Sequence, residues 1–285
     1  MYRGPIVVAL VVVWVAACSG PPGTTTPQPP KALTNALPDG PPLLTPGEHM
    51  TYRVELRGIE LASYEMAVGE QSEVSGKQTI VVQCHAKTVG LAGKIVPVDD
   101  FFTSFIDITT GRGVHWVTDE FATNGKDKER SDANLAGRTG DTVPVTFHLN
   151  DDPPMPEPQK VSFPDVWDFD SFLVALRSWE GQPGSKAVAE VLRSRFLWHV
   201  EITIGGKEKL VTEIGDFPAL RFDAHTYKLG RDDKRFPDSD ERNFSIWVSD
   251  DDGRVPLQIV AKTDYGDMKM KITDYQPGTG KRLRN

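Results

Sequence analysis

Residues 49–57, HMTYRVELR, alternate between apolar and polar side chains. The apolar members are Met50, Tyr52, Val54 and Leu56, and each is followed by a polar or charged residue. Successive side chains of a β-strand point to opposite faces, so a period of two is typical of a strand with one buried face. The segment therefore predicts the first strand of a sheet that buries one of its sides.

The same alternation recurs along most of the chain. Further strands are predicted at 60–68, 78–89, 101–108, 113–121, 142–149, 195–204, 208–214, 218–228, 243–249, 255–264 and 267–274. Gly205-Gly206 is expected to close a hairpin between 195–204 and 208–214, and the prolines of 150–164 predict an irregular connection. These patterns indicate a mainly β protein whose antiparallel sheet or sheets form an open or partial barrel or a sandwich.

One short helix is predicted at about 170–180. Asp170-Ser171 can cap it, and the segment that follows has no β-type alternation. Its apolar residues fall at helical spacing and form one stripe: Phe172, Ala175, Leu176 and Trp179. We expect this helix to close the open side of the sheet.

The amino-terminal residues have the layout of an export signal. Arg3 gives a positive start, and 12 apolar or small residues run from Ile6 to Ala17. A membrane-spanning helix needs about 20, so the run fits a signal peptide. Val15-Ala16-Ala17-Cys18 resembles the lipobox of bacterial lipoproteins, which implies cleavage before Cys18 and acyl chains such as palmitate on that residue. The same resemblance, with Ser19, implies an outer-membrane anchor facing the periplasm; the alternative is an ordinary signal peptide with an incidental cysteine.

Four segments follow from these patterns. Residues 1–17 are predicted as the signal peptide, and 18–46 as the lipidated cysteine and a Pro/Thr-rich disordered tether. Residues 19–46 hold nine prolines, and such a segment buries too little apolar surface to order itself. Residues 47–276 are predicted as one β-rich domain and 277–285 as a basic tail.

Composition narrows the classes of partner. The formal net charge is −8, and an acidic chain repels phosphate backbones, so a nucleic acid is not expected.

Cys84 shares a strand face with Ile80 and Val82, which predicts a small buried side chain; the alternative is a reactive thiol.

Four segments resemble an exported bacterial family known only as domain of unknown function 3108. They are Pro46-Gly47-Glu48-His49-Met50-Thr51-Tyr52-Arg53-Val54, Phe105-Ile106-Asp107, the stretch from Asp165 to Arg177, and the stretch from Phe244 to Leu257. In that family a "GE.L.Y" opening strand precedes a helix ending in "LR" and an "IW.S.D…R.P" hairpin. The resemblance covers roughly residues 46–275 and implies an envelope protein with an antiparallel β fold. It implies no catalytic residue.

No sequence motif clearly indicates catalysis or metal binding. Asp165, Asp168 and Asp170 are compatible with acid–base work, but acidic groups also favour the start of a helix. Asp250-Asp251-Asp252-Gly253 lacks the alternating ligands of a calcium loop and fits a hairpin turn. The six histidines show no metal-binding spacing. The sequence thus assigns no catalytic residue, metal ligand or cofactor.

The favoured hypothesis is a non-enzymatic lipoprotein of the cell envelope. Its β domain is expected to bind an apolar ligand or an envelope protein, with Phe172, Leu176, Trp179 and Trp198 as speculative ligand-binding residues; the alternative is that these residues form a closed core. A second hypothesis is an envelope enzyme acting on glycan or peptide through Asp168 or Asp170. A third is a structural assembly factor. The sequence leaves ligand, partner and oligomeric state open.

Overall fold

The computed structural model describes residues 37–121, 126–237, 239 and 241–284. The predicted signal peptide, Cys18 and the rest of the predicted tether up to residue 36 lie outside these residues. The strands are β1 (His49–Leu56), β2 (Ile59–Val74), β3 (Lys77–Thr88), β4 (Asp99–Asp107), β5 (Gly113–Phe121), β6 (Lys128–Ala133), β7 (Thr142–Val143), β8 (Val145–Leu149), β9 (Met155–Pro156), β10 (Gln159–Lys160), β11 (Val166–Asp168), β12 (Lys186–Arg193), β13 (Phe196–Thr212), β14 (Gly215–Lys228), β15 (Arg242–Ser249), β16 (Pro256–Thr263) and β17 (Gly266–Gln276). The helices are α1 (Gly90–Ile95) and α2 (Phe169–Ser178).

Most of the strands belong to one large sheet. Its order is β11-β12-β13-β14-β15-β16-β17-β1-β2-β3-β4-β5-β6-β8-β9, and β7 pairs with β10 separately. β17 pairs with β1, which joins the last strand to the first, and the parallel pair β11–β12 lies at one end. The outer strands β9 and β11 do not pair with each other, so the sheet is not closed into a barrel. The predicted mainly β, open antiparallel architecture is confirmed.

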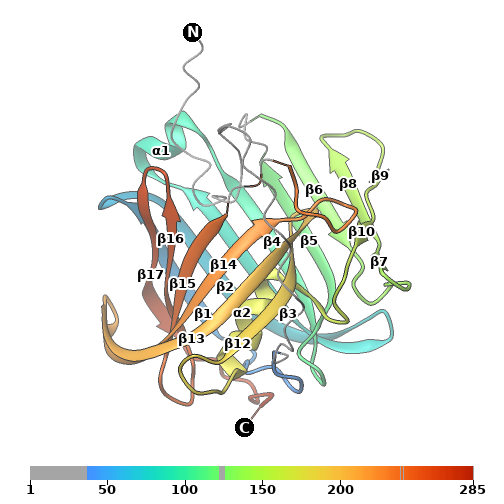
Figure 1. Ribbon diagram of the computed structural model, residues 1–285. Helices are drawn as coiled ribbons and strands as arrows, with labels where there is room; N and C mark the ends of the chain where they lie inside the picture. Colours follow the sequence, from blue (N-terminus) through green and yellow to red (C-terminus); the bar gives the residue numbers. More distant parts are fainter. Residues whose placement is uncertain (1–36, 122–125, 238, 240, 285) are drawn as a thin grey trace.

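The sheet curves around α2 (Figure 1). Eight consecutive residues of this helix, from Asp170 to Arg177, are buried, because the helix lies inside the curve and not on its surface. Its side chains join two core clusters: Val174 packs in the larger one, and Phe172 and Leu176 pack in the other. The predicted helix therefore exists, but it starts at Phe169, and the residue that caps it is Asp168.

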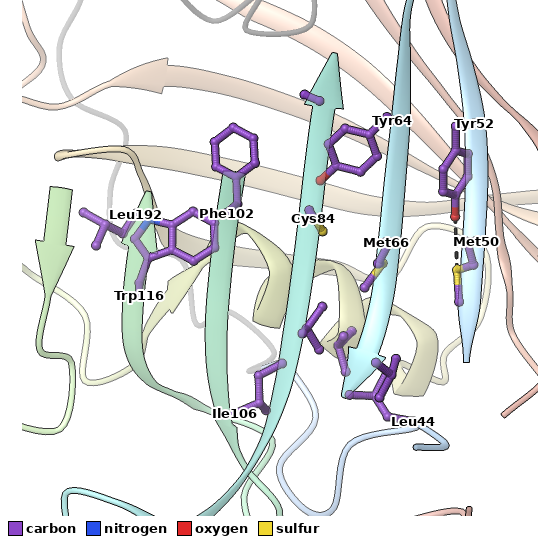
Figure 2. Packing of buried hydrophobic residues seen from close by; sticks show 14 of the residues in the cluster. Leu44, Met50, Tyr52, Tyr64, Met66, Cys84, Phe102, Ile106, Trp116 and Leu192 are labelled. Carbon is purple, nitrogen blue, oxygen red and sulfur yellow. Dashed lines mark hydrogen bonds between the residues drawn. The ribbon is translucent and has the colours of Figure 1, made fainter. Parts of the chain in front are cut away.

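The larger cluster is built by the inner faces of neighbouring strands. Figure 2 shows Met66, Cys84, Phe102 and Trp116 pointing from successive strands to the same side. This follows from the alternation in sequence, since every second residue of each strand faces inward. A buried side chain of this size contributes roughly 1.5–3 kcal/mol, so the inner face is the main source of stability.

The two ends of the open sheet overlap. Glu190 of β12 accepts hydrogen bonds from the backbone N–H of Ser162, at 3.1 Å to each carboxylate oxygen. The guanidinium of Arg195 lies 3.7 Å from the ring centroid of Phe147 on β8. The chain around β8 to β10 thus packs against the β12–β13 end of the sheet.

Several predicted elements need correction. Gly205-Gly206 do not form a turn: β13 runs through them, with a register shift between Ile204 and Lys207 against β14. The predicted strand 142–149 is two strands, because Pro144 interrupts it and has no N–H to donate.

Other elements were not predicted. Strands β6, β11 and β12 and helix α1 were missed, and the connection 150–164 holds the short strands β9 and β10. Neither described helix is long and apolar enough to span a membrane.

The packed structure also extends beyond the predicted boundaries of 47 and 276. Leu37, Leu43 and Leu44 are buried although they fall in the predicted tether. The backbone N–H of Leu283, in the predicted basic tail, donates to the carbonyl of Leu44 at 3.0 Å. Apolar leucines among the prolines are sufficient to hold this part of the chain against the core.

Candidate functional site

A small pocket lies between α2 and the inner face of β12, β13 and β15. Its lining is apolar except for one arginine: Phe169, Phe172, Val191, Arg193, Trp198, Val200 and Phe244. Its volume is about 20 Å³, which is room for roughly one water-sized group. An apolar lining with a single cation suits a ligand with an apolar part and one polar end.

The start of α2 decides where this pocket forms. Asp168 caps the helix, accepting from the Ser171 N–H at 2.9 Å, so Phe169 becomes its first residue. Phe169 and Phe172 are three residues apart and therefore share one face of the helix. Val191 and Arg193 are two residues apart on β12, so they share its inner face and meet the two rings.

The structure brings together two of the four predicted ligand-binding residues. Phe172 and Trp198 line the pocket, whereas Leu176 and Trp179 are not part of the lining. The ring of Trp179 stacks on that of Phe222, with centroids 5.7 Å apart. All four predicted residues are buried, and their binding role stays a prediction.

The pocket residues missed in the sequence are Phe169, Val191, Arg193, Val200 and Phe244. Val200 and Phe244 were visible only as members of predicted strands, and Phe169 as a residue before the predicted helix, whereas Val191 lies on a strand that was not predicted. Arg193 had no signal of its own, because it ends a strand that was not predicted. Its guanidinium lies 3.7 Å from the carboxylate of Glu120 on β5.

The three carboxylates considered for acid–base catalysis lie in different surroundings. Asp165 forms an ion pair with Arg112 at 3.1 Å. Asp168 and Asp170 are fully buried, and burial raises the pKa of both carboxyls. The pocket lining includes neither of them.

Hydroxyls and a thiol surround this buried pair. Asp168 Oδ2 accepts from Ser104 Oγ at 2.9 Å and from Ser171 Oγ at 2.8 Å. Cys84 Sγ donates to Asp170 Oδ1 at 3.3 Å, and Asp170 Oδ2 has no hydrogen-bond partner among the described residues. The predicted burial of Cys84 is confirmed, and burial raises the pKa of its thiol, which disfavours the reactive thiolate.

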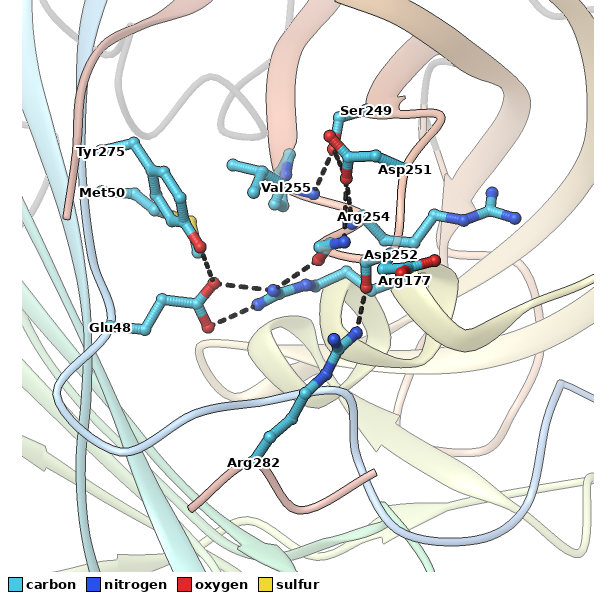
Figure 3. Close-up of polar contacts among 12 residues, drawn as sticks. Glu48, Met50, Arg177, Ser249, Asp251, Asp252, Arg254, Val255, Tyr275 and Arg282 are labelled. Atoms are coloured by element: carbon cyan, nitrogen blue, oxygen red, sulfur yellow. Dashed lines mark hydrogen bonds and ion pairs between the residues drawn. The ribbon is translucent and has the colours of Figure 1, made fainter. Parts of the chain in front are cut away.

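A second buried polar cluster lies at the other end of α2. Arg177 donates from Nη1 and Nη2 to the two carboxylate oxygens of Glu48, at 3.0 and 2.7 Å. Arg177 Nη2 also donates to the Gly253 carbonyl at 2.9 Å, and Tyr275 Oη donates to Glu48 at 3.1 Å. Figure 3 shows how this network joins the residue before β1, helix α2, strand β17 and the β15–β16 turn.

This network explains three of the segments that carried the family resemblance. Glu48 belongs to the opening motif, Arg177 ends the helix motif, and Gly253 lies in the hairpin motif. The motifs are far apart in sequence, yet their polar residues meet in one bidentate ion pair and its neighbours. Their shared property is therefore a structural one: they hold the helix inside the sheet.

The remaining candidate motifs form ordinary structure. Asp251 accepts from Ser249 Oγ and from the Gly253 N–H, each at 2.8 Å, so the acidic run 250–252 closes the β15–β16 turn. Within the described ranges, no three His, Cys, Asp or Glu side chains are grouped to hold a metal ion.

The fold and the pocket define an open, curved β protein wrapped around a buried helix. The chain belongs to the family described as "Protein of unknown function (DUF3108)", whose sequence model matches residues 51–273. No curated protein matches the chain.

Three solved structures are similar. A "beta-barrel-like protein" of domain of unknown function DUF1849 from Brucella abortus has a TM-score of 0.52 and 11% identity, over 83% of this chain and 99% of that chain. A protein with a YmcC-like fold from Bacteroides fragilis has a TM-score of 0.38 and 5% identity, over 84% and 99%. A protein from Parabacteroides distasonis, described provisionally as a lipoprotein, has a TM-score of 0.33 and 8% identity, over 84% and 100%. The Brucella likeness shows a shared fold.

Proposed function

We propose that the chain is a non-enzymatic lipoprotein of the cell envelope whose β domain binds an apolar ligand. The pocket beside α2 carries this proposal, because aromatic and aliphatic side chains from one helix and three strands converge on it. Such lining is typical of small-molecule sites. The proposal assigns no catalytic residue, metal or cofactor.

The pocket as it stands is smaller than an acyl chain, so binding requires it to widen. Phe169 is the side chain best placed to move, since it is only partly buried while Phe172 is almost wholly enclosed. A change of the Phe169 rotamer would open the pocket without displacing the helix. The expected ligand therefore enters beside the first turn of α2.

The proposed location in the envelope is based on the predicted signal peptide and on Cys18. The apolar run before Cys18 and the lipobox-like residues support export, cleavage and lipid attachment. Two or more acyl chains on Cys18 make such an anchor stable, and Ser19 supports the periplasmic side of the outer membrane. Replacing Cys18 by Ala should release the protein from membranes on fractionation; a variant that stayed membrane-bound would contradict the anchor.

The binding proposal is tested by native mass spectrometry. The chain from residue 19 onward would be expressed in the periplasm and purified without detergent. We expect an added mass that denaturation releases as lipid. A bare monomer that also takes up no added lipid would contradict apolar binding, and recovery of a defined protein instead would favour the assembly-factor hypothesis.

A further inference from the structure

Three cations lie at the edge of the pocket, and we call them the cationic rim: Arg193, Arg195 and Lys228. Arg193 follows Val191 by two residues on the inner face of β12 and itself lines the pocket. Lys228 on β14 is the register partner of Trp198, another lining residue. Arg195 lies in the turn between β12 and β13. The rim therefore continues the pocket wall toward the ends of these strands.

Lys228 is held by rings instead of carboxylates. Its ammonium lies 3.4 Å from the ring centroid of Phe196 and 4.4 Å from that of Phe236. No carboxylate of the described residues is within ion-pair distance of it. Burial, with the neighbouring Arg195 and Arg193, lowers the pKa of Lys228 to about 8. A half-buried cation crowded by two others is stabilised by an anion that reaches all three.

The two arginines each have a carboxylate partner, and the contact from Arg195 to Glu157 is within hydrogen-bond distance. Arg193 is 3.7 Å from Glu120, and Arg195 is 3.4 Å from Glu157. Both side chains keep some exposure, 11% for Arg193 and 23% for Arg195, so a ligand can reach them. A guanidinium has five N–H donors, so each arginine can also donate to a ligand anion.

The opposite wall does not cancel the rim's charge. It presents Asp100, Glu120 and Glu129 from β4, β5 and β6. Burial raises the pKa of Asp100 to about 7 and also raises that of Glu129. Asp100 and Glu129 are thus easier to protonate than usual, which reduces the negative charge that faces the rim near neutral pH.

We propose that the ligand is an anionic single-chain amphiphile, such as a fatty acid, whose head group lies on the cationic rim and whose chain enters the pocket. This inference rests on the proposed apolar binding and adds the charge of the head group. The carboxylate accepts hydrogen bonds from Lys228 and the arginines. The first methylenes then lie against Trp198 and Phe244, where burial of their apolar surface stabilises the complex.

The test compares two probes that differ only in the head group. Decanoate and decanol would be titrated calorimetrically into the chain from residue 19 onward at neutral pH. We expect decanoate to bind at least about tenfold more tightly, since charge-assisted hydrogen bonds are about twice as strong as neutral ones. Equal affinities would overturn the head-group inference and leave apolar binding intact, whereas no binding of either probe would overturn both.

Two variants locate the head group. Lys228→Gln should weaken decanoate by about tenfold and leave decanol unchanged, and Arg193→Gln should act in the same direction with a smaller effect, because Glu120 already shares that side chain. Lys186→Gln, at the exposed far end of β12, is the matched control and should change neither affinity. If Lys228→Gln and Lys186→Gln behaved alike in folded protein, the head group would not lie on the rim.

Discussion

The two ends of helix α2 are both buried and polar, yet they balance charge in opposite ways. At its last turn, Arg177 and Glu48 form a bidentate ion pair with side chains only 3% and 2% exposed. At its first turn, Asp168 and Asp170 meet hydroxyls and a thiol, and no ion pair within the described residues reaches either carboxyl. The first arrangement neutralises charge with an opposite charge, and the second favours protonation.

This difference indicates that the last turn of α2 is fixed in place, whereas its first turn can move. A bidentate pair with further hydrogen bonds has one good geometry and fixes the end of the helix to three parts of the sheet. Among the described residues, one carboxylate oxygen of Asp170 at the start of the helix has no hydrogen-bond partner, and this end of the helix adjoins Phe169 and the pocket. We therefore expect the helix to be held at Arg177 and to adapt at Phe169.

The largest expected effect is at the ion pair. Arg177→Met leaves the Glu48 carboxylate buried without its cation and should destabilise the fold by about 3–5 kcal/mol. Chemical denaturation measures this loss. The double variant Arg177→Met with Glu48→Gln should recover part of it, and a double variant as unstable as the sum of the single ones would contradict a coupled pair.

A smaller loss is expected at the cap. Asp168→Ala removes the acceptor of Ser104, Ser171 and the Ser171 N–H, so it should cost about 2 kcal/mol. Asp168→Asn keeps an acceptor oxygen and is the matched control, with a smaller expected cost. Equal stability of Asp168→Ala and the parent chain would show that the cap does not hold the helix start.

The smallest effect depends on pH. Because burial raises the pKa of Asp170, the folded chain binds this proton more tightly than the unfolded chain. The resulting stability is fully present below the unfolded pKa of about 4 and is lost as pH rises toward the folded pKa. Asp170→Asn cannot titrate, so its stability relative to the parent chain should increase with pH. Urea unfolding at about pH 5 and about pH 8 tests this, and a difference independent of pH would contradict it.

The sequence predicted the architecture well where one face of a strand is buried. Residues 49–57 and the later alternating segments became strands, because alternation records burial directly. β6, with sequence KERSDA, and β12, with sequence KAVAEVLR, were missed, since the first has almost no apolar residue and the second is rich in helix-forming ones. Gly205-Gly206 resembled a turn, but the sheet uses the pair as a bulge.

The site was predicted only in part, for a physical reason. Phe172 and Trp198 were found because an aromatic residue on an apolar face is conspicuous by itself. Arg193 and Lys228 could not be found, because their position beside the pocket depends on strand registers that one sequence does not reveal. The pairing of Glu48 with Arg177 likewise spans 129 positions, so its parts were visible only as separate motifs.

The most direct test of a ligand site beside α2 is a crystal structure of the chain from residue 19 onward, grown with decanoate. We predict an extended chain among Phe169, Phe172 and Trp198, with its carboxylate within hydrogen-bond distance of Lys228 and the ring of Phe169 turned outward. A fully occupied decanoate elsewhere, with these side chains in their present positions, would contradict the account.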